Sequence, residues 1–252
     1  MQLWMGTHAS GPASLWADPS TSLHGLIESS PRHFLGPRLT TSTFTESAKF
    51  PHSTHVPFLF KVLSIAKALP LQAHPDKRLG EWLHDADPQQ FVDSNHKPEI
   101  AVAIADGFRG FVGFREAQTI VHDLDEVSEL EEAVGDSGLM TRFRGDPSKE
   151  NLKAIFTKIL TAGQESISKV IQKLVSRIER QGASAIGGDE ERACVILKLN
   201  HQYPGDVGVL IAPFFMNLVT LNKGESVYIG ADEAHAYLEG GELDCIDPSI
   251  PY

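Results

Sequence analysis

The sequence predicts a mainly β protein into which a block of helices is inserted, on three observations. Short apolar runs of strand-like composition occupy the chain up to about Arg115. From about Glu116 the spacing of apolar residues changes from two to nearly four, which is typical of amphipathic helices. After Gly205 strand-like runs return. Because two β parts must pair to cover their edges, we expect one β domain, residues 1–115 and 206–252, around a helical domain, residues 116–205.

The first β part contains three predicted strands, at 56–63, 99–105 and 108–112. The last two are separated by Asp106-Gly107, and an Asp-Gly pair between apolar runs is a strong signal for a hairpin. A short helix is predicted within 77–91, where Leu79, Trp82 and Leu83 supply an apolar face.

The middle of the chain contains several amphipathic helices. Acidic residues at Asp189-Glu190-Glu191 suit the beginning of the last one, where the helix dipole favours negative charge. The apolar stripes recur at helical spacing, at Ile120, Val121, Leu124, Val127 and Leu130, then Leu152, Ile155, Phe156, Ile159 and Leu160, then Ile167, Val170, Ile171, Leu174, Val175 and Ile178. They indicate a packed helical subdomain and require no cofactor or partner helix.

The second β part contains predicted strands at 207–212, 214–221 and 226–230, with a turn at 222–225. Gly240-Gly241 is followed by neither a helix start nor a Lys-Ser pair, so it indicates a plain turn and not a phosphate-binding loop.

Composition excludes several classes of protein. With 41% hydrophobic and 22% charged residues among 252, the chain is an ordinary globular protein. A formal net charge of -11 argues against binding to nucleic acid or anionic membranes. No apolar stretch has the length of a membrane span, and the N-terminus lacks the pattern of a signal peptide. Two cysteines, Cys194 and Cys245, do not make a disulfide scaffold, so we expect a cytoplasmic protein.

Four residues are candidates for one metal site. Gln72 and His74 lie two apart in a strand-like run, so their side chains point to the same face. Glu99 begins the next apolar run, and His235 lies far along the chain. Imidazole and carboxylate are good zinc ligands. A Gln-x-His pair is common, however, and His74 taken alone indicates an ordinary surface or hydrogen-bonded histidine.

The sequence motifs around these residues resemble those of type I phosphomannose isomerases. The resemblance is carried in order by Trp4-Met5-Gly6-Thr7-His8, Phe58-Leu59-Phe60-Lys61-Val62-Leu63, Gln72-Ala73-His74-Pro75-Asp76-Lys77, Asn95-His96-Lys97-Pro98-Glu99 and His235-Ala236-Tyr237-Leu238. It implies a cupin-type jelly roll with a helical insertion domain. It also implies one zinc ion per chain, bound by Gln72, His74, Glu99 and His235, with no further cofactor. The matching Lys97 is implied to lie in the substrate pocket and to handle a proton or the phosphate.

The resemblance implies a zinc-dependent aldose-ketose isomerase that interconverts mannose 6-phosphate and fructose 6-phosphate and feeds GDP-mannose synthesis. Its partner would be a small sugar phosphate, and we expect a monomer that binds neither nucleic acid nor membrane. The alternative is a non-catalytic zinc-binding cupin remnant that binds a sugar phosphate or a protein.

The printed sequence also departs from the family pattern. It begins at the Trp-Met-Gly-Thr-His motif and ends before a Val-Arg-Ala-Gly motif that follows in the family. We therefore expect it to lack family segments at both ends. Pro70 stands where the family often has a phosphate-contacting Ser. We therefore expect zinc binding with poor isomerisation, because losing charge-assisted contacts to a phosphate weakens its binding.

Overall fold

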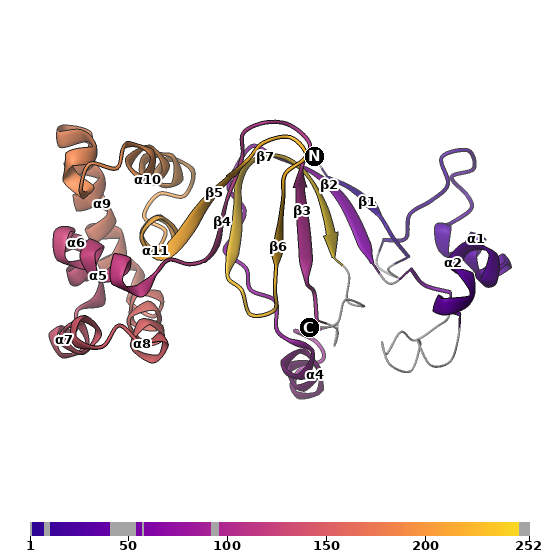
Figure 1. Cartoon of the computed structure of the whole chain (residues 1–252), viewed down its shortest axis with the longest axis horizontal. Coiled ribbons are helices and arrows are strands. Elements are labelled where there is room, and N and C mark those ends of the chain that lie inside the picture. The colour runs from indigo at the N-terminus through magenta and orange to yellow at the C-terminus, as the bar shows by residue number, and fades with distance from the viewer. Residues whose placement is uncertain (1, 8–10, 41–53, 57, 92–95, 247–252) are drawn as a thin grey trace.

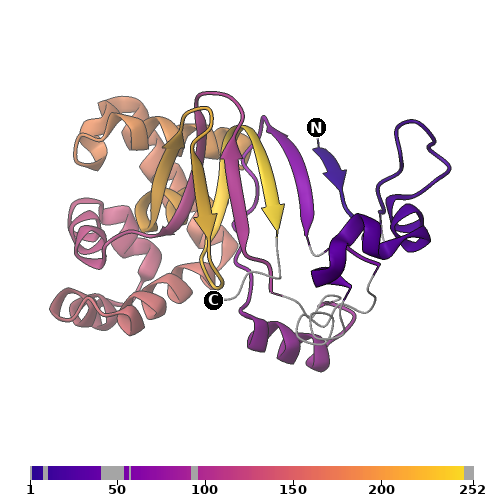
Figure 2. The same ribbon diagram turned by 45° about the vertical axis from the view of Figure 1, so that its right-hand side comes forward.

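Antiparallel strands form the centre of the protein, and helices lie at its two ends (Figure 1). The computed structural model describes residues 2–7, 11–40, 54–56, 58–91 and 96–246. Within them no helix is long and apolar enough to cross a membrane. Helices α5 to α11 stay on one side of the strands in both views, and α1 and α2 lie on the other (Figures 1 and 2).

The strands form two groups that share one long strand. The larger group, in the order in which its strands pair, is β1 (Gln2–Met5), β2 (Leu59–Ile65), β7 (His235–Ile246), β3 (Glu99–Ala103) and β6 (Ser226–Ile229). The smaller group is β5 (Met216–Leu221), β4 (Phe108–Phe114) and again β7. All the pairs are antiparallel. Two groups of antiparallel strands joined in this way agree with the expected jelly roll.

Strand β7 bends at Gly240-Gly241 and so serves both groups. Its first half pairs with β4, and its second half pairs with β2 and β3. Gly240 has a φ of 119°, and a Cβ atom there would lie 2.7 Å from the Cα of Phe108. The prediction of a plain turn at this pair was wrong, because the glycines lie inside a strand where two backbones approach closely.

The predicted hairpin at Asp106-Gly107 was also wrong. A turn exists there, but β3 pairs with β6 and β7, whereas β4 pairs with β5 and β7. The turn therefore carries the chain from one strand group to the other. The Asp-Gly pair correctly indicated a turn. It could not indicate that the two strands on either side of the turn pair with β7 and not with each other.

One face of the larger group forms an apolar interior. The alternation along β3 buries Glu99, Ala101 and Ala103 and leaves the residues between them half-buried. Glu99 thus points to the same side as Ala101 and Ala103, which belong to the core of the β domain together with Leu63, Ile65, Phe108, Val112, Leu221, Ile229 and Tyr237. A carboxylate in this position needs compensating partners.

The core of the helical block includes the predicted apolar stripe of α9 and extends to Phe111 of β4 and Leu238 of β7. The elements of the block are α5 (Ala117–Glu126), α6 (Ser128–Val134), α7 (Ser137–Gly145), α8 (Lys149–Leu160), α9 (Gln164–Gln181), the 3-10 helix η1 (Gly182–Ile186), α10 (Glu190–Gln202) and α11 (Gly208–Phe215). Asp189 caps α10 by accepting a hydrogen bond from the backbone N–H of Arg192.

The strand predicted at 207–212 is wrong, because α11 occupies this run and every residue from Val209 to Phe215 is buried. A continuous apolar run has no polar face to reveal its period, so spacing could not separate a buried helix from a buried strand. The helices consequently extend to Phe215, beyond the predicted boundary at 205, and β5 begins only at Met216.

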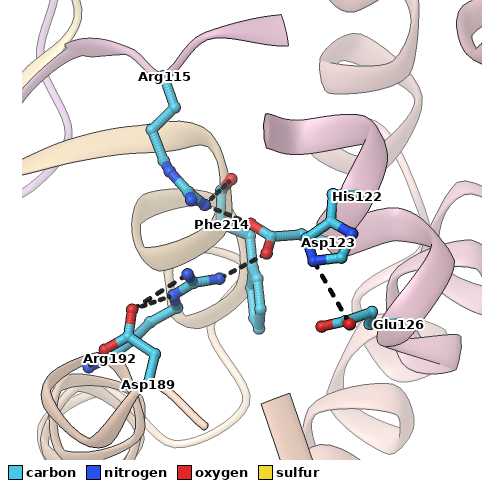
Figure 3. A network of polar contacts seen from close by, with 7 residues as sticks. All are labelled: Arg115, His122, Asp123, Glu126, Asp189, Arg192 and Phe214. Carbon is cyan, nitrogen blue, oxygen red and sulfur yellow. Dashed lines mark hydrogen bonds and ion pairs between the residues drawn. The ribbon is translucent and has the colours of Figure 1, made fainter. Parts of the chain in front are cut away.

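A partly buried network of charges joins the helical block to β4 (Figure 3). Asp123 of α5 accepts from Arg115, which follows β4, and from Arg192 of α10 at 2.8 Å. Arg192 also donates to Asp189, and Arg115 donates to the carbonyl of Phe214. Because each buried charge has at least one partner of opposite sign, the network can be desolvated.

The remaining helices lie outside this block. They are α1 (Leu23–Ser29), α2 (Pro31–Leu39) and α4 (Lys77–Ala86), of which α4 matches the short helix predicted within 77–91. Asp76 caps α4 by accepting from the N–H of Leu79. This cap ends the extended segment that carries Gln72 and His74.

Candidate metal centre

Three segments that are distant in the sequence bring three ligand-type side chains together. His74 lies in the segment between β2 and α4, Glu99 is the first residue of β3, and His235 is the first residue of β7. One nitrogen or oxygen of each side chain lies within 4.8 Å of those of the other two. None of the three comes from the helical block.

The segment that carries His74 runs antiparallel to the residues around His235. The Gln72 N–H donates to the His235 carbonyl and the His235 N–H donates to the Gln72 carbonyl, both at 2.9 Å. The Asp232 N–H donates to the His74 carbonyl at 2.7 Å. Directly opposed residues in such a pair project to the same face, so Gln72 and His235 share a face; the Gln72 side chain is exposed.

Glu99 lies between the two imidazoles. Its Oε1 atom is 3.0 Å from Nε2 of His74, and its Oε2 atom is 3.6 Å from Nε2 of His235. The ring centroids of the two histidines are 5.3 Å apart. Zinc–nitrogen and zinc–oxygen bonds of about 2 Å imply roughly 3–4 Å between neighbouring ligand atoms, and both measured separations lie in this range.

The two Nε2 atoms fit a metal ion better than they fit the protein around them. Both are buried, and among the described residues neither has a partner in hydrogen-bond geometry, although each lies near Glu99. On His235 the other ring nitrogen, Nδ1, is 3.0 Å from the carbonyl oxygen of Glu233. That carbonyl can only accept, so Nδ1 carries the proton and Nε2 keeps a lone pair. A buried imidazole lone pair beside a buried carboxylate is a donor pair that a divalent ion can satisfy.

The protonation states agree with this arrangement. Burial lowers the pKa of His235 below its ordinary value and so favours the neutral, metal-binding imidazole. Burial alone would raise the pKa of Glu99, but the contact with His74 outweighs it, Lys61 adds to the effect, and that pKa is lowered. Glu99 is therefore an anion at neutral pH.

The sequence analysis missed two residues that act on Glu99. The Tyr237 hydroxyl donates to Glu99 Oε2 at 3.1 Å, and Lys61 on β2 contributes positive charge near Glu99. Tyr237 could have been found, because it lies two residues after His235 in a strand and so shares its face. Lys61 could not, because its distance from Glu99 depends on the pairing of β2 and β3 with β7.

Lys97, the predicted proton or phosphate residue, lies two residues before Glu99 and is half-buried. It stands between His96 and Pro98, both of which are buried. Lys97 thus lies on the segment that leads into Glu99.

Models of one protein family match most of the chain. The model for the catalytic domain of type I phosphomannose isomerases matches residues 1–117, and the model for the helical insertion domain of that family matches residues 124–216. The second match begins inside α5 and ends at Met216, the first residue of β5.

Curated relatives and solved structures agree with these models. The mannose-6-phosphate isomerase of Candida albicans is 36% identical over 98% of this chain and 57% of that protein. Mannose-6-phosphate isomerase 1 of Arabidopsis thaliana is 38% identical over 98% of this chain and 56% of its own length. A Salmonella typhimurium mannose 6-phosphate isomerase bound to fructose 6-phosphate and zinc has a TM-score of 0.75 and 29% identity, covering 98% of this chain and 59% of that one. The chain thus spans a little over half the length of these proteins.

Proposed function

Because the chain belongs to the type I phosphomannose isomerase family, we propose that it interconverts mannose 6-phosphate and fructose 6-phosphate at the centre formed by His74, Glu99 and His235. The observation that carries the proposal is the convergence of these three side chains, with two buried Nε2 atoms directed at one carboxylate. The relatives named for this reaction match nearly the whole chain.

The proposed metal is one zinc ion, held by Gln72, His74, Glu99 and His235. A Salmonella typhimurium relative has been solved with zinc, and the imidazole and carboxylate donors suit zinc. The shared face of Gln72 and His235 makes the Gln72 amide available as the fourth ligand. When bound, zinc supplies a Lewis acid that stabilises negative charge on a sugar oxygen.

The protein's own groups have two tasks in this reaction. A base must move a proton between adjacent carbons of the sugar, and cationic groups must hold the phosphate at the other end. We assign Lys97 to one of these tasks, because it lies on the segment that leads into Glu99 and is half-buried there. Tyr237 keeps Glu99 oriented through its hydrogen bond.

The proposal extends to the setting of the enzyme. Its partner is a small sugar phosphate, and it acts as a cytoplasmic monomer whose product feeds GDP-mannose synthesis. The net charge of -11 supports a small substrate over nucleic acid or an anionic membrane.

Zinc content and turnover test the proposal together. Purified chain should bind one zinc ion per molecule, and a coupled assay that follows fructose 6-phosphate should detect conversion of mannose 6-phosphate. Glu99→Gln should abolish both signals, whereas Glu165→Gln, which changes an exposed residue of α9, should abolish neither. Zinc binding without turnover would overturn the isomerase proposal in favour of the non-catalytic remnant. The size of the turnover would test the expectation of poor isomerisation.

A further inference from the structure

The segment from Ala66 to Pro75 connects two separate cores of the molecule. Ala68 is buried and belongs to the core of the helical block, whereas Leu69 packs against the core of the β domain. His74 lies later on the same segment, next to the end of β7 that carries His235. The segment that carries this metal-site histidine is therefore held at Ala68 as well as beside His235.

The end of α10 holds both backbone groups of Ala68. The Ala68 N–H donates to Oε1 of Gln202 at 3.0 Å, and the Ala68 carbonyl accepts from the Tyr203 hydroxyl at 2.5 Å. Lys67 places its ammonium 4.0 Å from the centre of the Tyr203 ring. Gln202 is the last residue of α10 and Tyr203 follows it, with its own N–H bonded to the Leu199 carbonyl. The helix thus fixes the two side chains that bind Ala68.

Beyond Ala68 the segment has few other backbone contacts with β7. Leu69 donates to the Tyr237 carbonyl at 2.8 Å, Gln72 pairs with His235 as an isolated bridge, and the His74 carbonyl accepts from the Asp232 N–H just before β7 at 2.7 Å. Pro70 has no N–H to donate. In such a short ladder a slip of one residue would turn Gln72 and His74 to the opposite face, away from Glu99.

We propose that Gln202 and Tyr203 are positioning residues for the metal centre: by binding both backbone groups of Ala68, the helical block sets the register in which His74 meets Glu99 and His235. The helical block contributes no ligand among the described residues, so it acts on the site through the segments that it packs against, and Ala68 is the point at which it holds the segment that carries His74. The inference rests on the proposed metal function of the three side chains.

Substitutions at Gln202 separate the backbone contact from the rest of the residue. Gln202→Leu is similar in size and removes the acceptor, which leaves the buried Ala68 N–H unpaired. Gln202→Glu keeps an acceptor oxygen in the same place. We expect Gln202→Leu to bind zinc about 10-fold more weakly, the lower end of what loss of a ligand-orienting contact costs, and Gln202→Glu to stay within about threefold of the original chain.

Tyr203→Phe makes the complementary change, because it removes the hydroxyl that binds the Ala68 carbonyl and keeps the ring beside Lys67. Tyr228→Phe is the matched control, since Tyr228 is exposed on β6. Zinc affinity is measured by competition with a chelator on the full chain. The visible absorption of bound cobalt(II) reports the ligand geometry. Tyr203→Phe should weaken zinc binding and alter the cobalt spectrum, whereas the control should do neither.

The unfolding temperature of the metal-free variants separates positioning from simple stabilisation. If Gln202→Leu and Tyr203→Phe unfold at lower temperature but, when folded, keep the original zinc affinity and cobalt spectrum, the contacts only stabilise the fold and the inference is overturned. If Gln202→Leu does not fold, Tyr203→Phe alone decides by the same two measurements. If the original chain binds no zinc while remaining folded, the proposed function fails, which is a different result.

Discussion

The Tyr237 hydroxyl donates a hydrogen bond to Oε2 of Glu99 over 3.1 Å, between two buried side chains on β7 and β3. The same oxygen lies 3.6 Å from Nε2 of His235, so Tyr237 and His235 approach Glu99 from one strand. Glu99 is thereby held in one orientation before any metal is bound. This relationship gives the first of four predictions.

Tyr237→Phe should weaken zinc binding about 10-fold, because Glu99 loses the contact that orients it. The change keeps the ring, whose edge packs against Phe108 with centroids 5.6 Å apart. The free energy of unfolding should fall by only about 1 kcal/mol. Chelator competition and urea unfolding provide the two measurements, and an unchanged zinc affinity would show that Tyr237 does not orient the carboxylate.

Zinc should stabilise the folded chain through His235. Binding to the folded state alone contributes about 2.7 kcal/mol when free zinc is 100 times its dissociation constant. His235→Ala should remove this increment, whereas His122→Ala, at an exposed position on α5, should keep it. Thermal unfolding with zinc and with chelator measures the increment; equal increments in both variants would exclude His235 as a ligand.

Glu129 and Arg177 should make the helical block sensitive to acid. Arg177 donates two hydrogen bonds to the Glu129 carboxylate, at 2.9 and 2.6 Å. Burial alone would raise the pKa of Glu129, but Arg177 outweighs it and lowers that pKa. A carboxylate whose pKa is lowered on folding stabilises the fold at pH values above its unfolded pKa of about 4.3. This stabilisation is lost as the pH falls through its folded pKa.

Glu129→Gln should therefore cost about 2 kcal/mol at pH 7, because it leaves the half-buried Arg177 without its anion. The difference from the original chain should shrink as the pH falls below about 4. Urea unfolding of both chains, at pH 7 and at a pH below about 4, measures this difference in the free energy of unfolding. Glu165→Gln breaks an exposed pair with Lys169 and should cost no more than about 0.5 kcal/mol. A difference that grows in acid would contradict the assignment.

Gly240→Ala should destabilise the β domain by about 2 kcal/mol or more, because the new Cβ meets Phe108 and the positive φ is strained. Gly145→Ala is the control, since a Cβ atom at Gly145 would meet nothing within 4 Å. Thermal unfolding compares the two. If both substitutions are tolerated equally, the bend in β7 does not depend on glycine.

Several elements follow from the local pattern of residues. The apolar stripe of α9 and the acidic residues at the beginning of α10 are properties of consecutive residues, and the structure agrees with both. The metal candidates His74, Glu99 and His235 were found because the motifs around them resemble a family, since their spacing alone was not distinctive. The prediction that Gln72 and His74 share a face rested only on the alternation of side chains along a strand.

The sequence by itself determined the order of the β and helical parts and the apolar faces, because these depend on residues close together in the chain, and its motifs indicated the candidate ligands through their resemblance to a family. Only the tertiary structure decided which strands are neighbours, that 208–215 is helical, and that Ala68 is held by Gln202 and Tyr203. Those features depend on β7, which bends at Gly240 and pairs with strands distant in sequence, and on a buried apolar run with no polar face. Pairing between distant segments leaves no periodic signal in either segment, so it appears only when the chain is folded.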